Sequence, residues 1–162
     1  MILAVDDSRK VPKVLLERQY RHAANDYLWE LPAGRIEPGE KALRAAQREL
    51  LEETGFTAGE WRRILCFYAS PGFVAETMSV FLATALRAGK AQPEADEVIL
   101  SRMLPLPAAV AMVMSGKVRD GKTISSLLWL DHQIANRLPL HGGRKSSAGR
   151  VSRRAGKKRP QA

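Results

Sequence analysis

The sequence predicts an α/β sandwich with a mixed β-sheet. Short apolar segments of strand length alternate along the chain with segments that have the apolar spacing of helices. The chain has 162 residues, of which 45% are hydrophobic, and this is sufficient for one domain with its own core.

The N-terminal half is predicted to hold three extended segments and one helix. The extended segments are Ile2–Val5, Lys13–Tyr20 and Trp29–Leu31. The first two form either a hairpin or one strand interrupted by a loop, and polar residues 22–27 are predicted as a loop. The helix covers Glu40–Thr54, and Gly55 is its C-terminal stop.

The next part of the chain is predicted to contain three strands followed by two helices. The strands are Arg62–Ser70, Glu76–Leu86 and Val98–Leu104, and the helices are Pro107–Ser115 and Thr123–Arg137. The sequence SPGF forms the turn between the first two strands. Gly116 and Gly121 bracket the turn between the two helices.

Residues 138–162 differ in composition from the domain predicted over residues 1–137. They are rich in glycine, serine and basic residues, so a basic, disordered tail is predicted. Residues 144–162 hold eight Lys or Arg and no acid. The rest of the chain has 18 basic and 17 acidic residues, so the net charge of +9 belongs to the tail.

Composition also limits compartment and chemistry. The single cysteine, Cys66, excludes an intrachain disulfide, and its apolar neighbours predict a buried thiol. The three histidines lack zinc-ligand spacing. The N-terminus does not have the pattern of a signal peptide, and no apolar run is long enough to span a bilayer. A soluble, cytoplasmic protein without membrane contact is expected.

The most informative stretch is Gly34–Phe56. It contains a loop glycine, a Pro-Gly pair typical of a type II turn, and the predicted helix. At about 100° per residue, Glu49, Glu52 and Glu53 fall on one arc of that helix. Three carboxylates this close repel one another unless a cation lies between them, so the pattern favours a hard metal ion.

Two further features of the helix support a binding role. Ala42 and Ala45 lie on the same arc, and their small side chains leave room for a bulky ligand. Arg48 is four residues before Glu52 and is able to pair with it. Glutamates alone are more typical of a solvated helix surface. The combination of glycine, turn, helix and clustered acids favours the functional interpretation.

This stretch resembles the Nudix box at every fixed position. These are Gly34, Glu40, Arg48, Glu49, Leu50, Glu52, Glu53, Gly55 and Phe56. The resemblance implies a Nudix-type α/β/α sandwich hydrolase that cleaves a nucleoside diphosphate linked to another moiety, with Mg²⁺, or alternatively Mn²⁺, as cofactor.

The same resemblance implies roles for individual residues. Glu49 and Glu53 are the expected main metal ligands, and Glu52 is a further ligand or a catalytic neighbour of them. The backbone carbonyl of Ala33 is expected to complete one metal site. Arg48 is expected to orient the glutamates.

The flanking residues resemble the ADP-ribose pyrophosphatase branch. The resemblance rests on the sequences QYR at 19–21 and WELPAG at 29–34, on Pro71, which lies sixteen residues past Gly55, and on residues 117–130. It implies that Arg21 contacts the substrate phosphate and that Glu76 contacts substrate or holds its loop. Phe73 is a further candidate for substrate binding. A surface arginine, a solvated loop acid and a packed aromatic are the respective alternatives.

The acidic segment Pro93–Glu97 is the expected source of the catalytic base. In the resembling enzymes a glutamate on a mobile loop at this place activates the attacking water. Glu94 is the first choice, followed by Asp96 and Glu97. The alternative is an ordinary acidic turn.

The leading hypothesis is therefore a Mg²⁺-dependent pyrophosphohydrolase of ADP-ribose or a related nucleoside diphosphate sugar. One alternative is a Nudix hydrolase of nucleoside triphosphates or RNA 5′ ends. Another is a regulatory module tethered non-specifically to nucleic acid by the basic tail. Relatives of this branch commonly have extra N-terminal strands, which help to form a dimer and line the adenine pocket. This sequence begins almost at the catalytic domain, which puts a strand-swapped dimer and strict ADP-ribose specificity in doubt. A homodimer through the catalytic domain stays open.

Overall fold

The structure, a computed structural model, describes residues 1–91 and 99–140. Its elements are β1 (Ile2–Asp6), β2 (Lys13–Arg21), the 3-10 turn η1 (His22–Ala24), β3 (Asp26–Glu30), α1 (Ala42–Thr54), β4 (Phe56–Ser70), β5 (Val74–Ala88), β6 (Leu100–Pro105), α2 (Leu106–Met114) and α3 (Gly121–Ala135). Among these helices, none combines the length and the apolar character that a membrane crossing requires.

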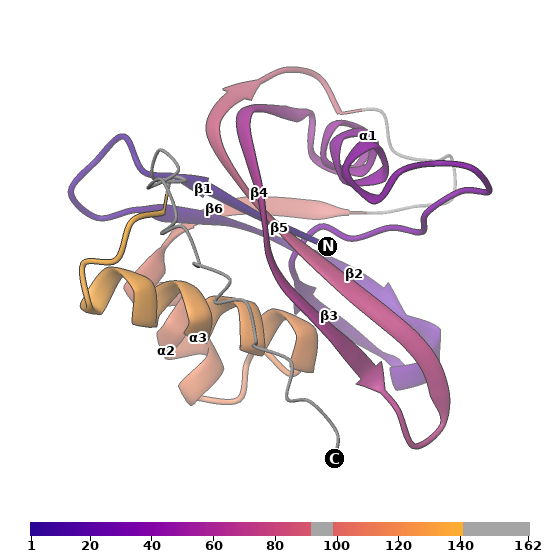
Figure 1. The fold of residues 1–162 in the computed structure, drawn as a ribbon. Coiled ribbons are helices and arrows are strands. Elements are labelled where there is room, and N and C mark those ends of the chain that lie inside the picture. Colours follow the sequence, from indigo (N-terminus) through magenta and orange to yellow (C-terminus); the bar gives the residue numbers. More distant parts are fainter. Residues whose placement is uncertain (92–98, 141–162) are drawn as a thin grey trace, which may run out of the picture.

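The predicted mixed sheet between helical layers is confirmed. The strand order is β3-β2-β1-β5-β4, and β6 pairs with β2. β1 and β5 are parallel, and the other pairs are antiparallel. Helix α1 covers one face of the sheet, and α2 and α3 cover the other (Figure 1).

The central strand β1 is buried on both faces because its side chains alternate between two cores. Ile2 and Ala4 join the cluster under α1, which includes Ala46 and Leu50. Leu3 and its neighbours on the opposite face join the larger cluster, which packs against α2 and α3. The sheet thus separates two apolar layers, and α1 is anchored through its small and aliphatic face.

The boundaries of several predicted elements change. β3 starts at Asp26, inside the segment predicted as a loop, and β4 starts at Phe56 rather than Arg62. β4 follows α1 directly and pairs with β5 over almost its whole length, which makes a long hairpin. Cys66 lies on this hairpin and is exposed, so the prediction of a buried thiol is wrong. Leu140 is only 9% exposed and belongs to the larger core.

Gly55 ends α1 where a side chain would not fit. Its φ of 74° is left-handed, and an added Cβ would lie 2.5 Å from the backbone nitrogen of Ala91. Gly116 has a nearly equal φ of 73°, but no atom lies within 4 Å of its added Cβ. Substitutions at both glycines cause backbone strain, but only a substitution at Gly55 also causes steric overlap.

We expect Gly55→Ala to destabilise the protein more than Gly116→Ala. The left-handed strain, about 1–2 kcal/mol, is common to both. Only Gly55→Ala also displaces the backbone at Ala91, for about 1–3 kcal/mol more. Urea unfolding of the two variants measures the difference, and equal losses of unfolding free energy would contradict the predicted overlap.

Candidate active site

The loop before α1 is fixed from two sides. The amide of Ile2 donates to the carbonyl of Pro32 at 2.8 Å, which attaches the loop to β1. The amide of Leu31 donates to Thr123 Oγ1 at 2.9 Å, and the Thr123 hydroxyl donates to Asp120, the N-cap of α3. Buried hydrogen bonds therefore set the position of the Ala33–Gly34 backbone next to α1.

The carboxylates of α1 approach this backbone closely. Glu53 is 8% exposed, and its Oε2 accepts a hydrogen bond from the amide of Ala33 at 3.2 Å. A Cβ added to Gly34 would lie 1.9 Å from the carboxylate carbon of Glu49. The φ of Gly34 is not left-handed, so backbone conformation does not require glycine here. Glycine is required because a Cβ would overlap the Glu49 carboxylate.

We expect Gly34→Ala to reduce turnover with little loss of stability. The overlapping atom is the end of a flexible side chain, so the Glu49 carboxylate moves aside while the fold remains. A misplaced catalytic group commonly costs about 100-fold in rate. Steady-state kinetics and a thermal melt on the same sample test this, and normal kcat with a normal melting temperature would contradict it.

Arg48 links the loop to the acidic face of α1. Its NH1 donates to Glu49 Oε1 at 2.8 Å and to Glu52 Oε2 at 3.0 Å. Its Nε and NH2 donate to Glu40 at 3.3 and 3.1 Å, and NH2 also reaches the Arg35 carbonyl. These hydrogen bonds, the one to Glu40 first, raise the pKa of Arg48. The predicted pairing with Glu52 is present, and Arg48 is also bonded to three further groups.

A hollow of about 500 Å³ opens at this place. It is lined by Arg21, Ala33, Gly34, Arg35, Glu37, Arg48, Glu49, Glu52 and Glu53. Three arginines and four glutamates give the lining a negative formal charge. A diphosphate would be repelled by this excess of carboxylates unless a cation were bound with it.

The lining of the charged hollow offers the oxygen ligands that a hard divalent cation needs, but the side chains that the structure describes there are not arranged around a cation site. Carboxylate and carbonyl oxygens are the ligands that Mg²⁺ or Mn²⁺ prefers. Within residues 1–91 and 99–140, however, no three acidic, histidine or cysteine side chains form a complete metal-ligand group. Arg48 is hydrogen-bonded to Glu49 and Glu52 in this arrangement. A cation bound by Glu49 would have to replace the Arg48 guanidinium there.

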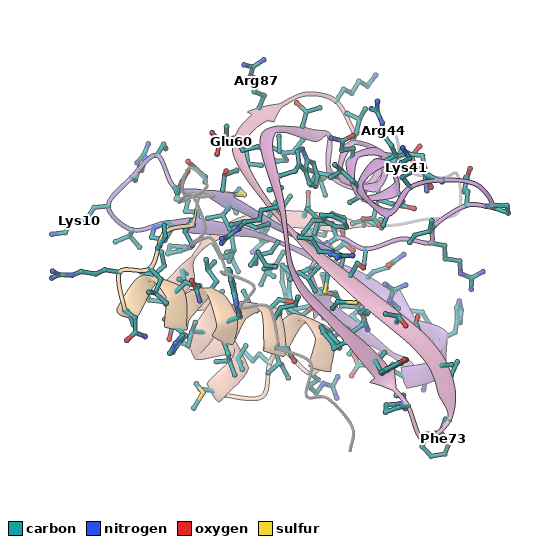
Figure 2. The ribbon with its side chains drawn as sticks, viewed as in Figure 1. Lys10, Lys41, Arg44, Glu60, Phe73 and Arg87 are labelled. Carbon is teal, nitrogen blue, oxygen red and sulfur yellow. The ribbon has the colours of Figure 1, made fainter. Side chains whose placement is uncertain are left out.

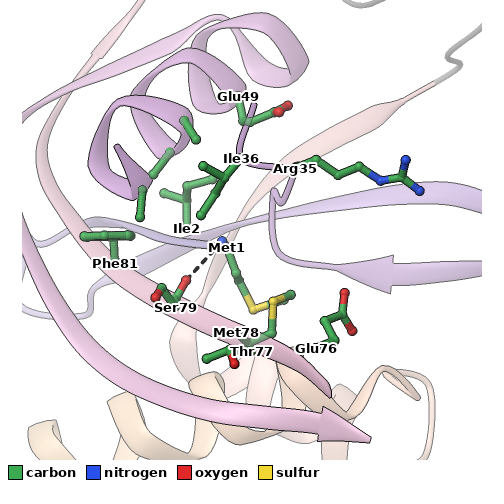
Figure 3. A pocket seen from close by; sticks show the side chains of 14 residues that line it. Met1, Ile2, Arg35, Ile36, Glu49, Glu76, Thr77, Met78, Ser79 and Phe81 are labelled. Carbon is green, nitrogen blue, oxygen red and sulfur yellow. Dashed lines mark hydrogen bonds between the residues drawn. The ribbon is translucent and has the colours of Figure 1, made fainter. Parts of the chain in front are cut away.

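A second hollow of about 320 Å³ adjoins the first and shares Gly34, Arg35 and Glu49 with it. Figure 3 shows α1 on one side of this hollow and β5 on the other. Ala42 and Ala45 line it, as their small side chains led us to expect, and Glu76 lies at its edge.

The predicted site residues separate into three groups. Those brought to the two hollows are Arg21, Ala33, Arg48, Glu49, Glu52, Glu53 and Glu76. Phe73 instead lies at the tip of the β4–β5 hairpin, 96% exposed and outside both linings (Figure 2). The predicted base Glu94 and its alternatives Asp96 and Glu97 lie outside the described residues.

Two buried acids were missed. Glu30 is 3% exposed and binds Arg21 through three contacts of 2.7–3.2 Å. Glu17 is fully buried and lies opposite Glu30 in the β2–β3 register. The available signal was a glutamate within an apolar strand: the period of two places Glu17 and Arg21 on one face with Leu15, which packs beneath α1.

Comparison with known proteins agrees with this geometry. A family model described as the NUDIX domain matches residues 1–126. The chain belongs to the Nudix hydrolase family. The Nudix box is thus the loop and helix that surround the charged hollow.

Among curated Nudix relatives, the ADP-ribose pyrophosphatase of Bacillus subtilis (strain 168) is 37% identical over 131 residues, covering 80% of this chain and 69% of the relative. The ADP-ribose pyrophosphatase of Mycobacterium tuberculosis (strain ATCC 25618 / H37Rv) is 35% identical over 130 residues, covering 78% and 61%. The GDP-mannose pyrophosphatase of Citrobacter koseri (strain ATCC BAA-895 / CDC 4225-83 / SGSC4696) is 36% identical over 132 residues, covering 76% and 69%. This chain therefore spans about two thirds of these relatives.

A solved structure shows the same fold. The crystal structure of an ADP compounds hydrolase superposes with a TM-score of 0.72 at 21% identity, covering 84% of this chain and 72% of that chain. At this identity the likeness supports the sandwich architecture alone.

Proposed function

We propose that this Nudix hydrolase is a Mg²⁺-dependent pyrophosphohydrolase of ADP-ribose or a related nucleoside diphosphate sugar. The observation that carries the proposal is the junction of two unlike hollows at Gly34, Arg35 and Glu49. The charged hollow suits a diphosphate with its cation. The second hollow, whose lining combines Ala42 and Ala45 with apolar residues such as Ile36 and Phe81, suits an attached organic group. The names of the ADP-ribose and GDP-mannose pyrophosphatases support this substrate class.

The cation would be held by Glu49, Glu52 and Glu53 together with the Ala33 carbonyl, with Mn²⁺ as an alternative to Mg²⁺. When bound, a divalent cation clamps the pyrophosphate, neutralises its developing charge and activates water. The negative lining of the charged hollow supports this requirement, because the three arginines do not outweigh the four glutamates.

Other side chains would bind the substrate and orient the metal ligands. Arg21 would bind the substrate phosphate, and Arg48 would hold Glu52 in place. Glu76 would contact the organic group in the second hollow. Water attacks one phosphorus, the bridging phosphorus–oxygen bond breaks, and ADP-ribose yields AMP and ribose 5-phosphate. Glu94, with Asp96 and Glu97 as alternatives, stays the predicted base for that water.

Several expectations remain predictions. They are the role of Phe73 in substrate binding, a homodimer, a cytoplasmic location and non-specific nucleic-acid contact through the basic tail. The tail from residue 141 onward lies outside the part of the chain that the structure describes.

Initial rates with Mg²⁺ on a substrate panel test the proposed function. The panel contains ADP-ribose, GDP-mannose, other nucleoside diphosphate sugars, dinucleoside polyphosphates and nucleoside triphosphates. We expect the highest kcat/KM on a nucleoside diphosphate sugar and no turnover with EDTA. Activity confined to triphosphates would overturn the substrate class, and full activity in EDTA would overturn the metal requirement.

A further inference from the structure

Arg21 and Glu30 form a guanidinium–carboxylate pair outside the Nudix box in which two N–H donors bond to one acid. Arg21 NH2 lies 2.7 Å from Glu30 Oε2, and its Nε lies 3.1 and 3.2 Å from the two carboxylate oxygens. The Glu30 side chain is 4% exposed, and that of Arg21 is 38% exposed. One end of the pair is therefore buried, and the other faces the charged hollow, which Arg21 lines.

The strand register explains why Arg21 points inward. Arg21 is opposite Asp26 at the end of β2, whereas Glu30 is opposite Glu17, four residues back along β2. The Arg21 side chain therefore extends along the sheet towards the box rather than into solvent. The bonds to Glu30 are the main cause of the raised pKa of Arg21, and the charges of Glu17 and Glu53 add to it.

Within residues 1–91 and 99–140, the hydrogen bonds of Arg21 leave a defined part of its guanidinium free to bind a ligand. A guanidinium carries five N–H groups, and Glu30 engages the Nε edge and one position on NH2. The remaining N–H groups, on NH1 and NH2, lie on the edge away from Glu30. That edge has the planar, two-donor geometry that suits phosphate oxygens.

We propose that Glu30 is a positioning residue: it fixes the guanidinium of Arg21 so that its free N–H edge binds the diphosphate in the charged hollow. The proposal rests on the proposed function, because it needs a diphosphate ligand. Glu30 acts through Arg21 and does not touch the substrate.

The test uses ADP with Mg²⁺ as the binding probe, alongside turnover of ADP-ribose. Glu30→Gln keeps the side-chain shape but removes the charge. We expect the Kd for ADP and the KM for ADP-ribose to rise about 10-fold or more, with a smaller change in kcat. Asp26→Asn is the matched control, since Asp26 is on the same strand as Glu30, pairs with Arg119 and lines neither hollow. We expect it to leave Kd and KM unchanged.

A double-mutant cycle separates positioning from a general structural role. If Glu30 acts through Arg21, Glu30→Gln has no further effect on the Kd for ADP in the Arg21→Gln background. An equal effect in both backgrounds, or a loss of thermal stability with unchanged Kd and KM, would overturn the proposal. If Glu30→Gln does not fold, Glu30→Asp, which keeps the charge on a shorter side chain, is measured in the same cycle.

Different results would contradict the proposed function and the role of Glu30. A wild-type protein that binds ADP with Mg²⁺ but hydrolyses no nucleoside diphosphate sugar would contradict the proposed function, and the cycle on ADP binding would still decide the role of Glu30. A wild-type protein that binds neither ADP nor GDP with Mg²⁺ would overturn both.

Discussion

Replacing Glu53 by glutamine is expected to reduce kcat at least about 100-fold while the fold survives. Glu53 is the most buried of the three box carboxylates proposed to hold the cation, and it is fixed against the Ala33 amide. Loss of a group that only orients a metal ligand typically costs about 10–100-fold, so loss of the ligand itself should reach or exceed the upper value. The glutamine oxygen is able to accept the same amide hydrogen bond, so little stability should be lost.

Turnover of ADP-ribose at saturating Mg²⁺, together with a thermal melt, measures this effect. Glu60→Gln is the matched control, because Glu60 is an exposed glutamate on β4 outside both hollows (Figure 2). Near-normal kcat in Glu53→Gln would exclude Glu53 as a metal ligand. A large loss in the Glu60→Gln control would show that the effect is not specific to the box.

Replacing Arg48 by methionine is expected to change turnover, stability and the dependence on metal together. Arg48 bridges Glu40, Glu49 and Glu52, so its removal leaves these three neighbouring carboxylates without the guanidinium that they share. We expect the free energy of unfolding without divalent cations to fall by about 1–2 kcal/mol, because such partly exposed pairs contribute little singly. We expect kcat to fall about 10–100-fold as the carboxylates lose their orientation.

Mg²⁺ should stabilise the Arg48→Met variant more than the wild type, because no guanidinium then competes for Glu49. Thermal melts over a Mg²⁺ titration test this. Arg44→Met is the control, since Arg44 is exposed on the same helix and bonds to Gln47. An equal Mg²⁺ shift in wild type and Arg48→Met would contradict the competition between arginine and cation.

The ion pair between Arg48 and Glu40 predicts that folding stability depends on pH. Arg48 holds the pKa of Glu40 below its ordinary value of 4.5. The stability from this pair is therefore complete above pH 4.5 and is lost as the pH falls through the lower pKa of the folded state. The difference in unfolding free energy between wild type and Arg48→Met should therefore become smaller as the pH falls below 4.5.

The parts of the fold that follow local rules were predictable from sequence. The box helix ends at Gly55 as predicted, because a left-handed residue is needed there. Strand β1 was recognisable from its short apolar run, and burial on both faces explains why it does not alternate with polar residues. The box carboxylates and Arg48 converge because their spacing on a helix determines their direction.

The remaining features depend on pairing between distant segments, which no local pattern encodes. β4 extends back to Phe56 because β5 pairs with it, although Gly59 and Glu60 are unfavourable in strands. Cys66 is exposed although its neighbours Leu65 and Phe67 pack against the larger core, because successive side chains of a strand point to opposite faces. Glu30 binds Arg21 through the β2–β3 register, which a reading of each strand alone does not supply.

Product analysis with ADP-ribose tests the central claim most directly. Wild-type protein with Mg²⁺ is predicted to release AMP and ribose 5-phosphate in equal amounts. No release is predicted with EDTA, and release by the Glu53→Gln variant is predicted to be at least about 100-fold slower. Release of other products, or equal release by the Glu53→Gln variant, would contradict a pyrophosphohydrolase that works through the carboxylates of α1.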